Sequence, residues 1–152
     1  MMNLRVRYPL WNIVSLIPLF LIGCSIIIRE GLDKDSPLSI FLEKGIFIEI
    51  VLLVFILGVY ILTLNSFNKK YPKQKINPFS FHPNEYIEDD EMFKQITMHT
   101  TKKVYTFMSV AIPFLFGLTI FATKLMIFIG IFIIITIQNL IFYNEMKRYT
   151  SE

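Results

Sequence analysis

The residue with the clearest capacity for chemistry is Glu49, a carboxylate inside a long apolar stretch. An ionised carboxylate in hydrocarbon is costly unless it is protonated, paired or reached by water, so such a residue is a candidate proton or cation site. If the stretch enters the hydrocarbon near Gly45, Glu49 lies only about 6 Å below the boundary at ~1.5 Å per residue. Its side chain could then reach the headgroups. We favour an interfacial carboxylate and keep the proton or cation site as the alternative.

Two sets of polar residues could surround ligands or join helices. The set at a depth similar to Glu49 contains Ser25, Arg29, Lys44, Thr119 and Lys124. The set nearer the opposite ends of the apolar stretches contains Asn12, Ser15, Thr63, Asn65, Thr106, Ser109, Gln138 and Asn139. Hydrogen bonds between membrane helices contribute about 0.6–2 kcal/mol and fix helix register without any ligand. We therefore interpret the second set as structural contacts.

Cys24 is the only cysteine, which excludes an intramolecular disulfide and any multi-cysteine metal site. The sequence Leu21-Ile22-Gly23-Cys24 follows a basic start and resembles the signal of bacterial lipoproteins, in which the cysteine is lipidated after cleavage. However, the apolar run continues through Ile28, where a cleaved signal normally turns polar. We expect Cys24 to be an apolar side chain of an uncleaved span, with lipidation as the minor alternative.

The sequence predicts no metal, cofactor or catalytic site. His82 and His99 are far apart and lack the i, i+4 spacing that directs two ligands from one helical face, so they do not indicate a metal site with the acidic run Glu88–Glu91. That acidic run is instead typical of a helix start. No phosphate-binding loop, nucleophile elbow or zinc-protease helix is present in the sequence. We do not expect an enzyme.

Four apolar stretches must position these residues, and each is long enough to cross a membrane. A hydrocarbon core of about 30 Å needs roughly 20 apolar helical residues, and helices satisfy their own backbone hydrogen bonds there. Of the 152 residues, 54% are hydrophobic and 18% are charged. This composition predicts one all-α membrane domain, a four-helix bundle of two helical hairpins. The expected spans are about 8–28, 41–66, 104–123 and 125–144, with a cytosolic connector over 67–103.

The positive charges predict the orientation of the spans. Of the 15 lysines and arginines, only Arg29, Lys34, Lys44 and Lys124 lie on the side of the connections between spans one and two and between spans three and four. The others lie with the two chain ends and the connector, and the positive-inside rule places that side in the cytosol. The aromatic residues Tyr8, Trp11, Tyr105 and Tyr143 are expected at this cytosolic edge. Both termini are therefore predicted to be cytosolic.

Local signals predict where two of the helices begin. Asp35-Ser36-Pro37 combines an N-cap residue with a first-turn proline, so the second helix should start there. Apolar residues and Thr100 recur at helical spacing after the acidic run, which predicts an amphipathic helix leading into the third span. The members of this pattern are Phe93, Ile96, Thr100, Val104 and Phe107.

For function, the sequence favours a non-catalytic membrane protein that acts by helix–helix contact. It would be a subunit or accessory factor of a membrane complex, or a self-protection protein of the immunity type, because four short helices have little interior but ample lipid-facing surface. Its partners would be the bilayer and a membrane protein or a second copy, without nucleic acid. The alternative is a small oligomeric ion- or proton-coupled transporter or channel that uses Glu49, with kinks at Pro18 and Pro113. The bias toward Ile, Lys, Asn and Phe resembles that of bacteria with low-GC genomes, which indicates the cytoplasmic membrane.

Overall fold

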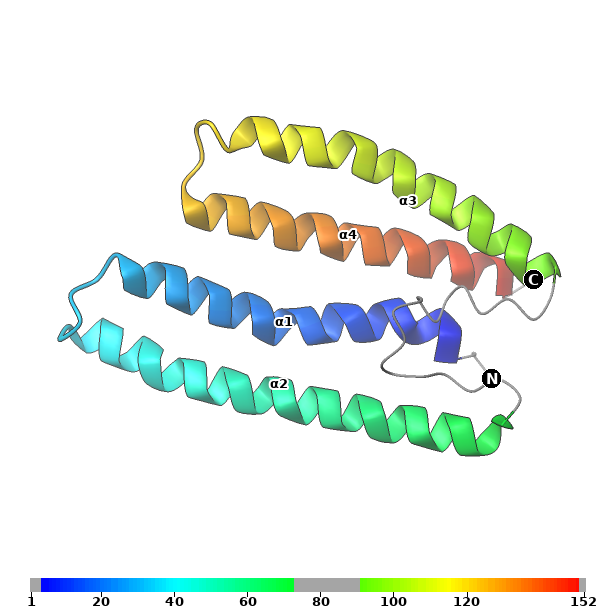
Figure 1. Cartoon of the computed structure of the whole chain (residues 1–152), viewed down its shortest axis with the longest axis horizontal. Coiled ribbons are helices and arrows are strands. Elements are labelled where there is room, and N and C mark those ends of the chain that lie inside the picture. Colours follow the sequence, from blue (N-terminus) through cyan, green and yellow to red (C-terminus); the bar gives the residue numbers. More distant parts are fainter. Residues whose placement is uncertain (1–3, 73–90, 151–152) are drawn as a thin grey trace.

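The chain forms four long helices in a computed structural model that describes residues 4–72 and 91–150. The helices are α1 (Leu4–Glu30), α2 (Pro37–Lys70), α3 (Glu91–Leu118) and α4 (Lys124–Thr150). Short connections join α1 to α2 and α3 to α4, which gives two antiparallel hairpins (Figure 1). The predicted all-α class is confirmed.

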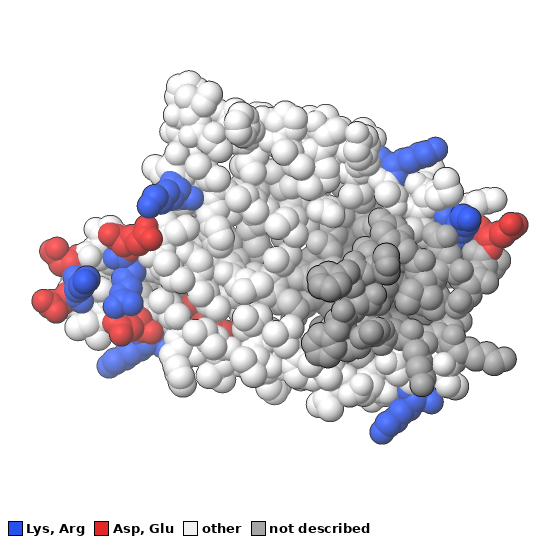
Figure 2. Space-filling view, in the orientation of Figure 1, with Lys and Arg blue, Asp and Glu red and all other residues white. Residues whose placement is uncertain are grey.

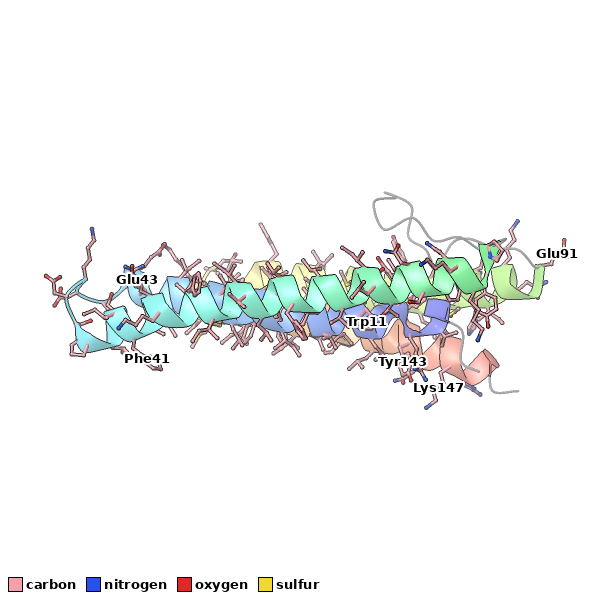
Figure 3. The ribbon with its side chains drawn as sticks, turned by 90° about the horizontal axis from the view of Figure 1, so that it is seen from below. Trp11, Phe41, Glu43, Glu91, Tyr143 and Lys147 are labelled. Atoms are coloured by element: carbon pink, nitrogen blue, oxygen red, sulfur yellow. The ribbon has the colours of Figure 1, made fainter. Side chains whose placement is uncertain are left out.

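The helices lie in a row in the order α2, α1, α4, α3 (Figure 1). Within the described residues, α1 contacts α2 and α4, and α3 contacts only α4. Figure 3 views the row from below, where the helices overlap into a thin layer. A closed bundle would bring α2 against α3 or α4, so the predicted bundle is not confirmed. The two edge helices, α2 and α3, each have one neighbour.

Three helices are long and apolar enough to cross a membrane: Val6–Glu30, Pro37–Lys70 and Lys124–Arg148. The expected third span, 104–123, differs because α3 ends at Leu118 and a turn follows it. The apolar part of α3, Val104–Leu118, is only about 22 Å long at ~1.5 Å per residue. A typical hydrocarbon core is about 30 Å thick. The three long apolar helices support the identification as a membrane protein.

The start of α2 follows the predicted capping pattern. Ser36 is the N-cap residue, and its hydroxyl accepts a hydrogen bond from the Ser39 amide at 3.2 Å. Pro37 follows as the first helical residue, where its missing amide hydrogen costs nothing because that donor has no partner within the helix. This cap ends the tight turn after α1 and sets α2 antiparallel to it.

The first turns of α3 form the amphipathic segment that the spacing predicts. Ile96, Thr97 and Thr100 are buried, whereas Lys94 and His99 are exposed. The helix continues from this segment to Leu118 without interruption. The buried side of α3 therefore faces α4 from the start of the helix.

The joint between the two hairpins is an aromatic contact of α1 with α4. The ring of Phe20 stacks on Phe132, with centroids 4.1 Å apart, and on Phe128 at 5.6 Å. Gly23, one turn after Phe20, allows this approach, because a Cβ added there would lie 2.2 Å from Cζ of Phe128. Without a side chain at Gly23, the Phe128 ring packs against the backbone of α1.

A small hydrophobic cluster joins three helices where α1 begins and α4 ends. Its buried members are Val6, Ile96, Phe142 and Met146, with Val104 and Tyr143 packed against them. These side chains come from α1, α3 and α4, so the cluster supports the joint at the end opposite the tight turns. Val6 and Met146 are fully buried.

Charged side chains gather at the two ends of the molecule and leave a broad apolar band between them (Figure 2). The start of α1 and the end of α4 lie at the same end (Figure 1). Figure 3 places Trp11 and Tyr143 towards that end, and Phe41 and Glu43 near the other. This pattern is that of a membrane-embedded chain with an aromatic edge.

Candidate functional site

The candidate site is the Glu49 carboxylate, which lies in the contact between α1 and α2. The Ser25 hydroxyl donates a hydrogen bond to Oε1 of Glu49 at 3.2 Å. Ser25 is buried, and Glu49 is partly buried. The second carboxylate oxygen, Oε2, is buried and has no hydrogen-bond partner. One half of the carboxylate thus binds across the helix contact, while the other half is enclosed without a hydrogen-bond partner, where a proton on the carboxyl group could be accommodated.

Three of the other four residues expected near Glu49 have partners elsewhere, and the fourth, Lys44, is exposed. Arg29 donates to Oε2 of Glu43 at 2.6 Å and lies 3.4 Å from the buried hydroxyl of Ser39. Lys124 pairs with Glu30 at 3.1 Å. The hydroxyl of Thr119, in the turn after α3, donates to the carbonyl of Phe116 in that helix. Of the residues predicted at the depth of Glu49, the structure brings Ser25 to it by a hydrogen bond.

The ion pairs at the hairpin turns give a reference for the depth of Glu49. Glu43, which pairs with Arg29, precedes Glu49 on α2 by about 9 Å at ~1.5 Å per residue. Glu49 therefore lies below the charged end of the molecule, inside the apolar band. A buried carboxylate needs hydrogen-bond donors, and the Ser25 hydroxyl provides one. Among the described residues, no group of three metal-ligating side chains occurs. The chemistry open to this site is binding of a proton or a single cation.

Cys24 is adjacent to Ser25 on α1 and is partly exposed. Helix α1 continues past it to Glu30. That Cys24 is an apolar side chain of an uncleaved span stays a prediction, with lipidation as its minor alternative.

Among the polar residues predicted nearer the cytosolic ends, one pair joins two helices. Asn12 on α1 donates to Oδ1 of Asn139 on α4 at 3.2 Å, and Asn139 donates to the Ile135 carbonyl. Other members bond within their own helix: Ser15, Thr63, Thr106 and Ser109 each donate to a carbonyl three or four residues earlier. These hydrogen bonds do not bring polar residues from all four helices together at one site. The Asn12–Asn139 bond is the structural contact that we expected of this set.

The candidate polar residues of the connector lie partly outside the described part of the chain. His82 and Glu88–Asp90 lie outside the described residues. His99 is exposed on α3, and Glu91 is exposed at the start of that helix.

Sequence reasoning missed an ion pair between α3 and α4. Nζ of Lys103 lies 2.7 Å from Oε1 of Glu145, whose side chain is only 16% exposed. Lys103 lies 15 residues before the end of α3 at Leu118, whereas Glu145 lies 21 residues after the start of α4 at Lys124. The two residues are not equidistant from the turn, so counting from the turn would not have found this pair.

No family model, curated protein or solved structure matches this chain. Function is therefore argued from the geometry alone.

Proposed function

We propose that this chain is a multi-pass protein of the bacterial cytoplasmic membrane that acts without catalysis, by contact between its helices and those of a partner. In this proposal all four helices are embedded, both termini are cytosolic, and the chain serves as a subunit or accessory factor of a membrane complex or as a self-protection protein. Two observations support this orientation. Most lysines and arginines lie on the side of the chain ends and the connector, and the start of α1 and the end of α4 lie at the same end of the molecule (Figure 1).

The observation that carries the proposal is a regular ridge on α2, the edge helix with one neighbour. Four large apolar residues repeat every seven positions along it and are 66–70% exposed: Phe41, Ile48, Phe55 and Leu62. We call this set the α2 ridge. A seven-residue repeat keeps one side of a helix against a partner over many turns, as in left-handed helix pairs. This spacing would let one partner helix follow the α2 ridge along its length.

Two glycines beside the α2 ridge would let a partner approach closely. A Cβ added at Gly45 or Gly58 would meet no atom within 4 Å, so neither glycine is required by contacts within the described chain. Membrane helix contacts are enriched in small residues because van der Waals packing drives them. The two glycines, each between two large side chains of the α2 ridge, therefore support a helix-binding edge on α2.

Photo-crosslinking in native membranes tests this proposal. We expect a diazirine-bearing residue at Ile48 or Phe55 to give a discrete protein adduct, because these positions face the partner. The control is Phe116 on α3, which is 77% exposed and outside the α2 ridge, and should label lipid. An adduct with a different protein supports the subunit or accessory role, and an adduct with a second copy supports self-association. Lipid labelling alone at all three positions would contradict contact through α2.

The second candidate function is a small oligomeric transporter or channel that uses Glu49. The buried Oε2 atom without a partner favours it, since a carboxylate in the apolar band can bind a proton or cation. The helix prolines Pro18 and Pro113 give this second candidate no further support within one chain. Pro18 is buried in α1, whereas Pro113 is exposed on α3, which contacts neither α1 nor α2. A shared path would need several copies.

Flux measurements in liposomes test this second candidate. If Glu49 carries a proton or cation, Glu49→Gln should abolish the flux, because the amide keeps the shape of the side chain but cannot ionise. Glu43→Gln is the matched control, since it removes an exposed carboxylate on the same helix and should leave the flux unchanged. Equal flux in the wild type, Glu49→Gln and Glu43→Gln would eliminate Glu49 as the carrier.

A further inference from the structure

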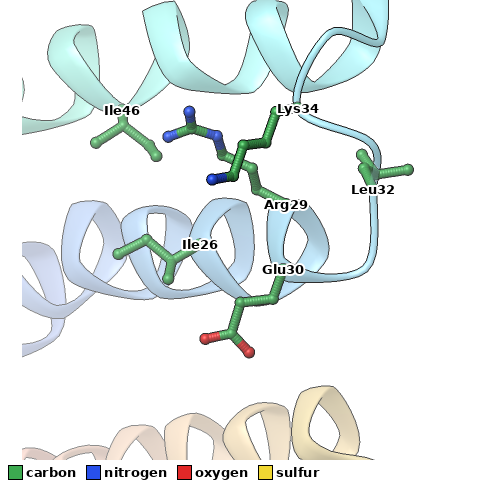
Figure 4. Close-up of a pocket in the computed structure, with 6 residues that line it drawn as sticks. All are labelled: Ile26, Arg29, Glu30, Leu32, Lys34 and Ile46. Atoms are coloured by element: carbon green, nitrogen blue, oxygen red, sulfur yellow. The ribbon is translucent and has the colours of Figure 1, made fainter.

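A cleft of about 300 Å³ lies at the end where α1 turns into α2, and it combines positive charge with apolar walls. Its lining residues are Ile26, Arg29, Glu30, Leu32, Lys34 and Ile46. Figure 4 shows the guanidinium of Arg29 and the ammonium of Lys34 between the two helices, on the side of Ile46. Two cations from different segments thus enter the same small space.

The carboxylates near the cleft leave part of this charge uncompensated. Glu30 points away from the gap between α1 and α2, towards α4 (Figure 4), where Lys124 pairs with it at 3.1 Å. Glu43 pairs with Arg29 through Nη2. Lys34 is exposed and forms no ion pair within residues 4–72 and 91–150. The six lining residues thus include two cations and one carboxylate, and Lys34, which Asp33 and Asp35 flank in the chain, is the lining cation without an ion pair among the described residues.

The apolar walls indicate what kind of anion fits. Ile26, Leu32 and Ile46 line the cleft beside the cations, and Ile26 is continuous with the exposed apolar surface of α1. Ion pairs mark this end of the molecule as the level where headgroups lie (Figure 2). A ligand at this level with an anionic head and apolar chains would meet the cations with its head and the isoleucines with its chains.

We propose that this cleft binds the phosphodiester of an anionic phospholipid of the phosphatidylglycerol type. Lys34 and the free edge of the Arg29 guanidinium hold the phosphate, while Ile26 and Ile46 contact the upper parts of the acyl chains. Among the lining residues, the carboxylate of Glu30 is already paired and is directed away from the cleft, so it offers no partner to the cation of a zwitterionic head. This inference rests on the proposed membrane location but not on contact through the α2 ridge.

Native mass spectrometry of the purified full chain in a non-ionic detergent tests the site. We expect phosphatidylglycerol to bind more tightly than phosphatidylcholine, and Lys34→Gln to weaken phosphatidylglycerol binding about fivefold, since one lysine near a membrane surface contributes ~1 kcal/mol. Lys34→Arg should retain the affinity. Lys44→Gln is the matched control: it removes one exposed lysine at the same end but outside the cleft, and should leave binding unchanged.

Three results would overturn the assignment. Equal losses in Lys34→Gln and Lys44→Gln would show that diffuse surface charge attracts the lipid. Displacement of phosphatidylglycerol by inorganic phosphate at equal concentration would make this a site for the free anion. Equal affinity for phosphatidylcholine would remove the preference for an anionic head. Because lipid retention is measured on the isolated chain, it is independent of the crosslinking result at Ile48 and Phe55.

Discussion

Replacing Gly23 with leucine is expected to loosen the joint between the two hairpins and to lower the free energy of unfolding by about 1–3 kcal/mol, the usual cost of overpacking. A Cβ at this position would lie 2.2 Å from Cζ and 2.6 Å from Cε1 of Phe128. The Phe128 ring has little room to yield, because it is stacked almost parallel to Phe20 with an interplanar angle of 3°. The larger side chain must therefore push α4 away from α1.

The matched control for this variant is Gly117→Leu on α3. A Cβ at Gly117 would meet no atom within 4 Å, and the substitution carries the same gain in helix propensity. Both variants can be unfolded in mixed micelles by increasing the fraction of a denaturing detergent, followed by circular dichroism. Equal stability of the two variants would mean that α1 and α4 are not held together through Gly23 and Phe128.

Truncating Met146 to alanine is expected to destabilise the protein by about 2–5 kcal/mol, the range for large-to-small changes at buried positions. Met146 is fully buried among Val6, Ile96 and Phe142, so the truncation leaves a cavity where three helices meet. The control is Met126→Ala on the same helix, where the side chain is 62% exposed and leaves no cavity. The same unfolding measurement compares them. If Met126→Ala costs as much as Met146→Ala, the cluster does not hold the helix ends together.

The existence of the helices could be predicted from the sequence, but their order in space could not. Long apolar stretches and the Ser36-Pro37 cap determine where helices lie along the chain, and tight turns make neighbours of α1 with α2 and of α3 with α4. The contact between α1 and α4 depends on which side of each helix turns inward. Helix α2 is apolar over almost its whole circumference, so its pattern does not distinguish a side for a neighbour from a side for lipid. The arrangement of the helices in a row could therefore not be predicted from the sequence.

The candidate site could be predicted in part. Glu49 was identified because a carboxylate is conspicuous in an apolar stretch, and Ser25 was among its expected partners. The choice of Ser25 over Arg29 or Lys124 depends on helix rotation and on the competing carboxylates Glu43 and Glu30, each of which lies closer to a cation. The depth of Glu49 along its helix could be predicted from the sequence, but the competition for its possible cationic partners could not.

The unequal lengths of the two edge helices have a consequence for the surrounding bilayer. The apolar part of α2, residues 45–68, extends about 36 Å, whereas the apolar part of α3, residues 104–118, covers only about 22 Å at ~1.5 Å per residue. In the proposed orientation, lipids beside α3 must compress or tilt to match it, at a cost of fractions of a kcal/mol for each ångström of hydrophobic mismatch. Membrane thickness would then fall from one flank of the protein to the other, and neighbouring proteins with short spans would gather preferentially at the thin flank.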